Sequence, residues 1–345
     1  MNLNKLLRKN IKNLVPYSSA RDEFSGDGKV FLDANENPFN EPYNRYPDPL
    51  QKMLKRKISD IKGVSREQIF LGNGSDEPID LLIRAFCEPE TDNIVTIDPT
   101  YGMYQVAANI NNVAIRKVSL SPGFVLDPMN VLHAVDLHTK LIFLCSPNNP
   151  SGNNLSRSAM LHIVRNFKGI VIVDEAYIDF SPENSLVPDL EAHQNLLVLQ
   201  TLSKAWGMAG IRLGMAFASP EIIAVLNKIK YPYNLNILTQ QKALELLENK
   251  TEVENWVSTL IGERKRVSEE LKKLETVQKV YPSDANFVLV AVDDAPGMYQ
   301  QLVINGIIVR DRSKVNLCAG CLRITIGSPE ENNLLLNALK TLNQL

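Results

Sequence analysis

The chain has 345 residues, 44% of them hydrophobic and 22% charged, which is typical of a folded globular protein with room for about two domains. Its 37 basic and 39 acidic residues give a net charge of -2, so charge provides no reason to expect nucleic acid or an anionic membrane as a partner. Four scattered cysteines exclude a disulfide framework, and no apolar run approaches the roughly 20 residues of a membrane-spanning helix. We therefore expect a cytoplasmic protein.

The first 30 residues have the pattern of an amphipathic arm. The segment MNLNKLLRKNIKNLVPY carries basic residues but lacks the continuous apolar core and the small-residue cleavage site of a secretory signal. We expect residues 1–30 to pack on the smaller domain or on a partner chain.

From Ile69 to Ala218, short apolar runs alternate with helical patterns. The runs are IFL, NIVTI, KLIFLC, IVIV, NLLVLQ and MAFA. Because they are continuous, they predict strands buried on both faces, as in a mostly parallel sheet covered by helices. Between the first two runs, SDEPIDLLIRAF predicts a helix capped by Ser75. We assign this α/β unit to a large domain of residues 31–250.

A smaller α/β domain is predicted for residues 251–345. Helical patterns rich in Leu, Glu and Lys run from Gln240 to Leu274 and lead out of the large domain. Beyond them, the strand-like segments VQKVY, NFVLVAV, GIIVR and CLRITIG alternate with helical PGMYQQLVI and with a helix that starts at the capping-box sequence SPEE, from Ser328.

Four polar loops follow four of the predicted strands. GNGSDE follows IFL, SPNNPSGN follows LIFLC, DEAY follows IVIV, and TLSK follows LVLQ. Parallel strands end at the same carboxyl edge, where open α/β sheets bind their ligands. The sequence therefore predicts one crevice that gathers Ser75, Asn149, Asp174, Tyr177, Ser203 and Lys204.

Each of these residues also has a simpler explanation when taken alone. Asp174 suits the cap of a following helix, and Asn149 suits a turn beside proline. An isolated lysine such as Lys204 is most often a solvated surface side chain. Only their joint position at one edge favours a functional site.

The residue types at this edge describe a ligand. GNGSDE offers glycines and the free N–H groups of a helix amino terminus, and Ser203 and Arg212 add a hydroxyl and a guanidinium, which together suit a phosphate. Lys204, partly desolvated and close to another cation, suits a nucleophile for an aldehyde. Asp174 among apolar residues needs a cationic partner, such as a protonated pyridine nitrogen. These three groups together describe pyridoxal 5'-phosphate.

These motifs resemble the fold-type I pyridoxal-phosphate aminotransferases over nearly the whole chain. TLSKAWGMAGIRLG, SPNNPSG and VDEAYIDF are similar to the superfamily as a whole. LDANENPF, NRYPDP, LGNGSDEPIDLLIRAF, DPTYGMY and GCLRITIG narrow the resemblance to its histidinol-phosphate branch, within class II. The resemblance implies transamination between L-histidinol phosphate and 2-oxoglutarate, giving imidazole acetol phosphate and L-glutamate, as a step of histidine biosynthesis.

The resemblance also implies roles in binding the cofactor. Lys204 would form the Schiff base with its aldehyde and later move the proton, and Asp174 would keep the ring nitrogen protonated. Asn149 and Tyr177 would hydrogen-bond the ring hydroxyl, and Tyr101 would stack on the ring. Around the phosphate the resemblance places Gly74, Ser75, Asp76, Ser203 and Arg212, joined by Tyr46 of the partner subunit in a homodimer with shared active sites.

On the substrate side, the resemblance implies that Arg323 binds the carboxylate of the amino-acid substrate and faces the phosphate of histidinol phosphate. Asn35, Tyr17 and Arg310 are further substrate contacts that it suggests.

Other functions fit parts of the pattern. Decarboxylation of phosphothreonine and broad-range aromatic transamination use the same cofactor and much of the same motif set. A non-enzymatic regulator with this fold would need a DNA-binding module, for which the arm is too short and the net charge too near zero. A nucleotide-dependent enzyme is suggested by GNGSDE alone, but a third glycine is missing and the chain has no G-x-x-x-x-G-K-[ST] motif.

The sequence CAGC, from Cys318 to Cys321, has the spacing of a zinc or redox site. Zinc needs two further ligands, and the four histidines show no matching spacing. We therefore predict structural cysteines and no bound metal.

Overall fold

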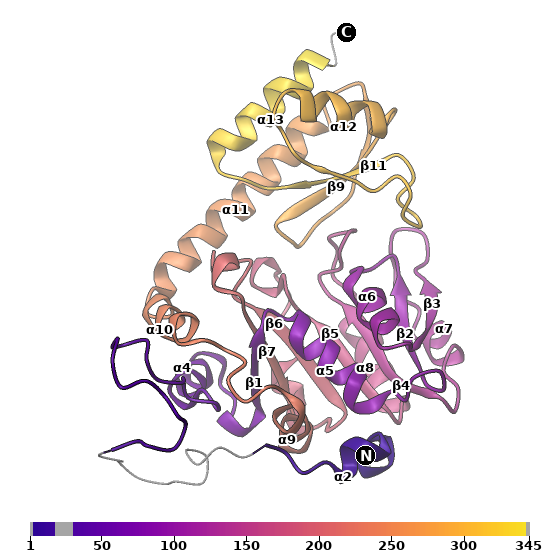
Figure 1. Cartoon of the computed structure of the whole chain (residues 1–345). Coiled ribbons are helices and arrows are strands. Elements are labelled where there is room, and N and C mark those ends of the chain that lie inside the picture. Colours follow the sequence, from indigo (N-terminus) through magenta and orange to yellow (C-terminus); the bar gives the residue numbers. More distant parts are fainter. Residues whose placement is uncertain (1–2, 18–29, 343–345) are drawn as a thin grey trace.

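The protein is represented by a computed structural model that describes residues 3–17 and 30–342. Within these residues the strands form one sheet of seven and one of four, and helix α11 (Lys250–Leu271) runs between them (Figure 1). Val253 near the start of α11 packs in the core of the large sheet, whereas Leu271 at its end packs in the core of the small sheet. The domain boundary at residue 250 therefore stays a prediction, because this helix belongs to both cores.

The large sheet contains every strand predicted from the sequence and one more. Its strands are β1 (Ile69–Asn73), β2 (Asn93–Asp98), β3 (Ala114–Ser119), β4 (Thr139–Cys145), β5 (Ile170–Asp174), β6 (Leu196–Thr201) and β7 (Leu213–Ala218), in the order β1-β7-β6-β5-β4-β2-β3. The sequence analysis missed β3, which lies at the edge of the sheet and is largely exposed, because it lacks the continuous apolar run of a buried strand.

Strand direction brings the predicted loops to one edge, as expected for a mostly parallel sheet. Neighbouring strands from β6 to β3 are parallel, whereas β7 runs antiparallel to both β6 and β1. The carboxyl ends of β1, β4, β5 and β6 therefore share an edge with the amino end of β7. This reversal places Arg212, the residue before β7, beside the other loops.

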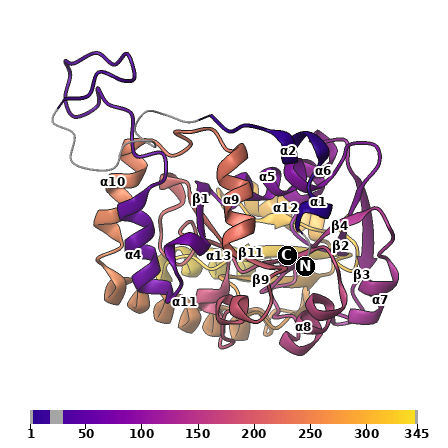
Figure 2. The same ribbon diagram turned by 90° about the horizontal axis from the view of Figure 1, so that it is seen from below.

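Helices cover both faces of the large sheet (Figure 2). The helices of one face are α5 (Asp76–Phe86), α6 (Met103–Ile110) and α9 (Pro220–Ile229). Those of the other face are α4 (Lys52–Lys62), α7 (Pro128–His133), α8 (Arg157–Asn166) and α10 (Ile237–Leu246). Among the described residues, no helix is both long enough and apolar enough to cross a membrane.

The start of the amino-terminal arm packs on the large sheet's helices instead of on the small domain. Its short helices are α1 (Leu3–Leu6) and α2 (Lys9–Asn13). Leu3 and Leu6 of α1 and Ile11 of α2 pack against the core that contains α5. Between them, the Arg8 N–H donates to the Ala85 carbonyl at 3.0 Å, and its side chain forms an ion pair with Glu88 at 3.3 Å. The last carbonyls of helix α5 have no acceptor role within the helix, so they are available to accept hydrogen bonds from Arg8. This explains why the arm packs at the end of α5. Residues 18–29 of the predicted arm lie outside the described residues.

The small sheet is antiparallel throughout and lies with one face toward the large sheet. Its strands are β8 (Val277–Val280), β9 (Phe287–Val292), β10 (Arg310–Asp311) and β11 (Cys321–Thr325), in the order β10-β11-β9-β8. Alternate residues such as Val288 and Leu322 pack against α11, α12 (Ala295–Ile304) and α13 (Pro329–Leu342). Phe287 and Leu289 lie on the opposite face and join the core of the large sheet.

Hydrogen bonds fasten the small sheet to the loop after β4. The Asp284 N–H donates to the Gly152 carbonyl at 2.7 Å. The Asp284 carboxylate accepts from the backbone N–H and the side-chain amide of Asn154, at 3.2 and 2.9 Å. This loop also carries Asn149, so its position depends on a residue of the small domain.

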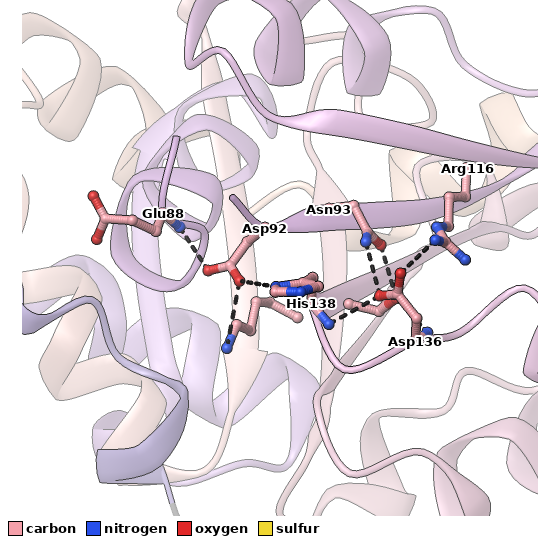
Figure 3. Close-up of polar contacts among 8 residues, drawn as sticks. Glu88, Asp92, Asn93, Arg116, Asp136 and His138 are labelled. Atoms are coloured by element: carbon pink, nitrogen blue, oxygen red, sulfur yellow. Dashed lines mark hydrogen bonds and ion pairs between the residues drawn. The ribbon is translucent and has the colours of Figure 1, made fainter. Parts of the chain in front are cut away.

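A second polar cluster lies at the opposite edge of the large sheet (Figure 3). Asp136 accepts from the Asn93 amide at 2.9 Å and forms an ion pair with Arg116, and Asp92 lies 3.6 Å from the Lys140 amine. These bonds join the amino ends of β2, β3 and β4. The cluster therefore ties strands together at the edge away from the predicted crevice.

We predict that Asp284→Ala lowers the free energy of unfolding by about 1 to 3 kcal/mol, because it leaves two Asn154 donors without their acceptor. Chemical denaturation measures this loss. The control is Asp293→Ala, because Asp293 is exposed and its carboxylate accepts from the Gln278 amide at the surface, so its effect should stay within about 0.5 kcal/mol. An equal loss of unfolding free energy in the two variants would show that the hydrogen bonds from Asn154 to Asp284 do not stabilise the protein.

Candidate active site

A cavity opens at the carboxyl edge of the large sheet, where the sequence predicts it. Its volume is about 140 Å³. A single water needs roughly 10 to 15 Å³ by this measure, so the cavity has room for a small molecule. Its lining consists of Gly74, Ser75, Asp76, Tyr101, Cys145, Asn149, Asp174, Ala176, Tyr177, Thr201, Ser203, Lys204 and Arg212.

One end of the cavity has the features of an anion cradle. Gly74 has a left-handed φ of 70°, and a Cβ there would lie 2.6 Å from the Arg212 guanidinium. The turn also packs directly on β7, since a Cβ at Gly214 would lie 2.1 Å from the carbonyl carbon of Gly74. The Ser203 hydroxyl oxygen is buried and has no hydrogen-bond partner among residues 3–17 and 30–342, and Arg212 lies 3.8 Å from the Asp76 carboxylate. A phosphate would satisfy both the hydroxyl and the guanidinium.

The prediction that Ser75 caps α5 is wrong. Ser75 occupies the cap position, but its side chain forms no cap hydrogen bond. Its backbone is already helical, with φ -69° and ψ -11°, whereas a capping side chain requires an extended residue. Glu77 instead accepts from the Asn73 N–H at 2.6 Å, so the Ser75 side chain is free to line the cavity.

Lys204 lies in the turn after β6 and reaches the same cavity. Its amine lies 5.5 Å from the centre of the Tyr177 ring, and none of the described residues forms a hydrogen bond or an ion pair with it. Burial lowers its pKa below the usual lysine value, and the positive charge of Arg323 lowers it further. Such an amine is more often neutral, and therefore nucleophilic, than a surface lysine.

Asp174 is the last residue of β5, and its carboxylate is buried at the floor of the cavity with only 2% of the residue exposed. It accepts hydrogen bonds from the Tyr104 hydroxyl at 2.6 Å and from the Ala176 N–H at 3.1 Å. Burial raises the pKa of Asp174 to about 6 despite these bonds. A cation placed beside this carboxylate would be strongly favoured.

Sequence reasoning missed Tyr104, the residue that orients Asp174. Tyr104 is 1% exposed and stacks on Phe143, at 4.9 Å between ring centres. It follows Tyr101 by three residues in the segment PTYGMY, and the centres of the two rings lie 5.6 Å apart. This short spacing from a residue already assigned to the site was the available signal.

Asn149 and Tyr177 line the side of the cavity next to the small sheet, and Arg323 lies behind Asn149 without lining the cavity itself. The Asn149 amide lies 3.4 Å from the Tyr177 hydroxyl oxygen, and the Arg323 guanidinium donates to the Asn149 carbonyl oxygen. Burial raises the pKa of Tyr177, so its hydroxyl keeps its proton and can donate. Burial and the nearby charge of Arg312 lower the pKa of Arg323.

The remaining predicted residues do not line this cavity. Tyr46 is half-exposed and stacks on Tyr233, at 4.4 Å between ring centres. Asn35 and Tyr17 are exposed on the segment before α4. Arg310 is exposed in β10, opposite Arg323 in the register of β10 and β11. Their roles stay predictions.

The donor set fits the three groups of pyridoxal phosphate. The cradle of Ser203 and Arg212 suits the phosphate, the amine of Lys204 suits the aldehyde, and the buried Asp174 suits a protonated ring nitrogen. All four side chains border the same cavity. A single ligand can therefore contact them together.

Comparisons with known proteins agree with this chemistry. The profile of the class I and II aminotransferases matches residues 29–339. The chain is 62% identical over 340 residues to a histidinol-phosphate aminotransferase of Parabacteroides distasonis, with 99% of each chain covered. It is similar to the crystal structure of the histidinol-phosphate aminotransferase from Clostridium acetobutylicum, with a TM-score of 0.81 and 26% identity, covering 88% of this chain and 91% of that one.

A further structural neighbour is the histidinol-phosphate aminotransferase from Sinorhizobium meliloti, solved in complex with pyridoxal-5'-phosphate. Its TM-score is 0.79, with 22% identity over 87% of this chain and 83% of that one. At this level of identity the similarity concerns the fold.

We predict that Asp174→Asn stabilises the cofactor-free protein at high pH. The raised pKa of Asp174 means that its ionisation costs folding free energy as pH rises from about 4 to 6, and the full cost remains above that window. Removing the charge should therefore raise the free energy of unfolding at pH 8 by about 2 to 3 kcal/mol. Urea denaturation at pH 5 and pH 8 measures the change. If the variant gains the same free energy of unfolding at both pH values, or loses free energy at pH 8, then Asp174 does not have a raised pKa in the folded protein.

Proposed function

The chain belongs to the class I and II aminotransferase family, and on that basis we propose that it transfers the amino group of L-histidinol phosphate to 2-oxoglutarate with pyridoxal 5'-phosphate as cofactor. The products are imidazole acetol phosphate and L-glutamate, in a step of histidine biosynthesis. The observation that carries the proposal is the single cavity bordered by Lys204, Asp174 and the anion cradle of Arg212.

The cofactor, when bound, supplies an aldehyde that condenses with amines and a protonated ring that withdraws electrons from the substrate's Cα. Lys204 is the group that moves the proton. Burial lowers its pKa and so favours the neutral form of the amine, in which Nζ can accept a proton from the substrate carbon and return it to a neighbouring carbon. Its approach over the Tyr177 ring keeps the amine inside the cavity.

Asp174 holds the proton of the ring nitrogen. Its carboxylate is buried, and a cationic ring nitrogen in contact with it would restore full ionisation of the acid. The Tyr104 hydroxyl donates to one carboxylate oxygen, which leaves the other oriented by the Ala176 N–H. With the cofactor bound, this fixed carboxylate would favour the protonated ring nitrogen.

Substrate anions bind at Arg323. The amino donor brings a phosphate and glutamate brings a carboxylate, and one guanidinium can bind either group. Arg323 donates a hydrogen bond to Asn149, the residue proposed to contact the ring hydroxyl. A substrate anion on Arg323 would therefore be linked to the ring through Asn149. The relatives at high identity carry the name histidinol-phosphate aminotransferase, which favours this donor over phosphothreonine or aromatic amino acids.

We also propose a homodimer in which the segment before α4 of one subunit reaches the active site of the other. Large apolar side chains are exposed along the segment before α4, including Val15 at 86%, Leu32 at 91% and Phe39 at 76%. A monomer rarely leaves so many of them uncovered, so a second copy of the chain is the occupant that we infer. Tyr46 on this segment would then contact the partner's phosphate cradle. A cytoplasmic location remains a prediction from the sequence.

We predict that Lys204→Ala abolishes the reaction. L-histidinol phosphate added to the cofactor-loaded wild type should change the visible absorbance in a single half-reaction. The variant should be slower by about 10² to 10⁴-fold or more, because it lacks the proton-transferring group. Lys242→Ala, at an exposed lysine paired with Glu245, is the control and should react like the wild type.

Two results would contradict this function. The first is a Lys204→Ala variant that reacts at the wild-type rate. The second is release of carbon dioxide from phosphothreonine without turnover of glutamate.

We predict that two inactive variants restore each other if the site is shared. Lys204→Ala and Tyr46→Ala should each have low activity alone. Mixed dimers contain one site with both defects and one intact site, so co-expression should recover about a quarter of the wild-type activity. Co-expressed Lys204→Ala and Ser203→Ala, which both affect the subunit's own cradle, provide the control and should not recover. Failure of the first pair to recover activity would show that Tyr46 serves its own subunit.

A further inference from the structure

A second cavity, separate from the active site, lies beside the edge strand β1 of the large sheet. Its volume is about 530 Å³, within the range of roughly 300 to 1,000 Å³ that is typical of small-molecule sites. Its lining comes from the start of α4, from the 3₁₀ turn Arg66–Gln68 and from α9 (Figure 2). The two cavities share no lining residue among the residues that the structure describes, so a ligand in one leaves the other free.

Lys55 is a buried lysine in the wall of this cavity. It is only 7% exposed and shares the buried side of α4 with Leu54 and Ile58. Lysine is almost never buried without a partner, yet among residues 3–17 and 30–342 its amine forms no hydrogen bond and no ion pair. A leucine would pack at this position without the cost of burying a charge. Packing alone therefore does not account for this lysine.

The charges around Lys55 do not neutralise its amine. Burial lowers the pKa of Lys55 to about 8, and the nearby positive charge of Lys230 lowers it further. Asp48 and Glu67 act in the opposite direction, but more weakly than either of these causes. The Asp48 carboxylate already accepts two backbone N–H groups at the start of α4, at 2.9 and 2.6 Å. The amine is therefore still charged at pH 7, and its charge is uncompensated.

Two more cations line the cavity. Lys52 and Arg66 are exposed at its rim, and within the described part of the chain neither side chain forms an ion pair. Of the described residues in the lining, Glu67 is the one acid, so three cations and one acid leave an excess of two positive charges near pH 7. Such an excess around a buried amine favours a bound dianion.

The cavity also contains a hydrogen-bond acceptor without a donor. The Oδ1 atom of Asn227 on α9 is buried and has no partner in the part of the chain that the structure describes. An ionised carboxylate has no hydrogen to donate to it. A phosphate ester does, because its second pKa is about 6 and a fraction of the groups carries a proton near pH 7. The charge and the orphan acceptor therefore both favour a phosphate over a carboxylate.

We propose that this cavity is a binding site for an organic phosphate monoester, whose phosphate contacts Lys55, Lys52 and Arg66. Such a phosphate has a charge of about -1.5 to -2 near pH 7, which matches the excess positive charge of the lining. Leu50 and Pro220 also line the cavity and provide apolar surface for the organic part of the ligand. The site contains no group of the proposed active site, so it does not depend on the proposed function.

Isothermal titration calorimetry with phenyl phosphate on the cofactor-loaded protein tests the site. Lys55→Met nearly keeps the size of the side chain but removes its charge, so it should bind about one phenyl phosphate fewer per chain than the wild type. Lys57→Met is the control, because Lys57 lies on the same helix, pairs with Glu248 and does not line the cavity. It should bind as many molecules as the wild type. Equal numbers in the wild type and Lys55→Met would overturn the proposal.

This comparison counts only the binding that needs Lys55. Phenyl phosphate bound in the active site contributes equally to the wild type and to both variants. A failure of the proposed transamination therefore leaves the result of the titration unchanged.

Further titrations test the chemistry of the ligand. At the site that Lys55→Met removes, Arg66→Gln should weaken phenyl phosphate about tenfold, because one charge-assisted contact is lost. Benzoate has a carboxylate in place of the phosphate, and inorganic phosphate lacks the ring. Each should bind this site at least about tenfold more weakly than phenyl phosphate. Benzoate or inorganic phosphate that binds as tightly as phenyl phosphate would overturn the proposal of an organic phosphate monoester.

The unfolding midpoint provides a second readout and reveals a variant that misfolds. Without phenyl phosphate, Lys55→Met should have a higher midpoint than the wild type at pH 7, because it lacks the unpaired buried charge. The gain should shrink as the pH rises above about 8, because the amine of the folded wild type then becomes neutral. A midpoint at pH 7 below that of the wild type would show that the fold itself satisfies Lys55, and the proposal would then be wrong.

Discussion

The buried carboxylate of Asp174 is the constraint on which the site depends. It lies at the end of a central strand, and no cation among the described residues forms an ion pair with it. Folding alone provides only two hydrogen bonds for it, so burial raises its pKa to about 6. Burying this acid at the floor of the cavity therefore lowers the free energy of unfolding at neutral pH. A ligand with a cationic ring nitrogen restores that loss, which links cofactor binding to the stability of the large domain.

Strand direction explains how distant segments reach this acid. Asn149, Asp174 and Lys204 lie at or after the carboxyl ends of parallel strands, so they share one edge of the sheet. Arg212 precedes β7, which runs in the opposite direction, so it lies at the same edge. The small sheet then closes the open side with Arg323, while Asp284 holds the loop that carries Asn149. The residues proposed to bind anions thus come from both sheets.

Much of this arrangement was predictable because buried strands and their carboxyl-terminal loops leave strong local patterns. The family, the mostly parallel sheet and the converging loops follow from such patterns. Strand β3 was missed because an edge strand needs no continuous apolar run. Tyr104 was missed because its role depends on a contact with Asp174 seventy residues away in the sequence. Ser75 was assigned to capping because sequence shows residue type and position but not the backbone angles that decide a cap.

Asp174 is proposed to keep the cofactor's ring nitrogen protonated inside the same cavity as Lys204. The most direct test is the nitrogen-15 NMR signal of ring-labelled pyridoxal phosphate bound to the wild type and to Asp174→Asn. We expect a protonated ring nitrogen in the wild type at pH 8 and an unprotonated one in the variant. The same ring protonation state in both proteins would show that Asp174 does not have this role.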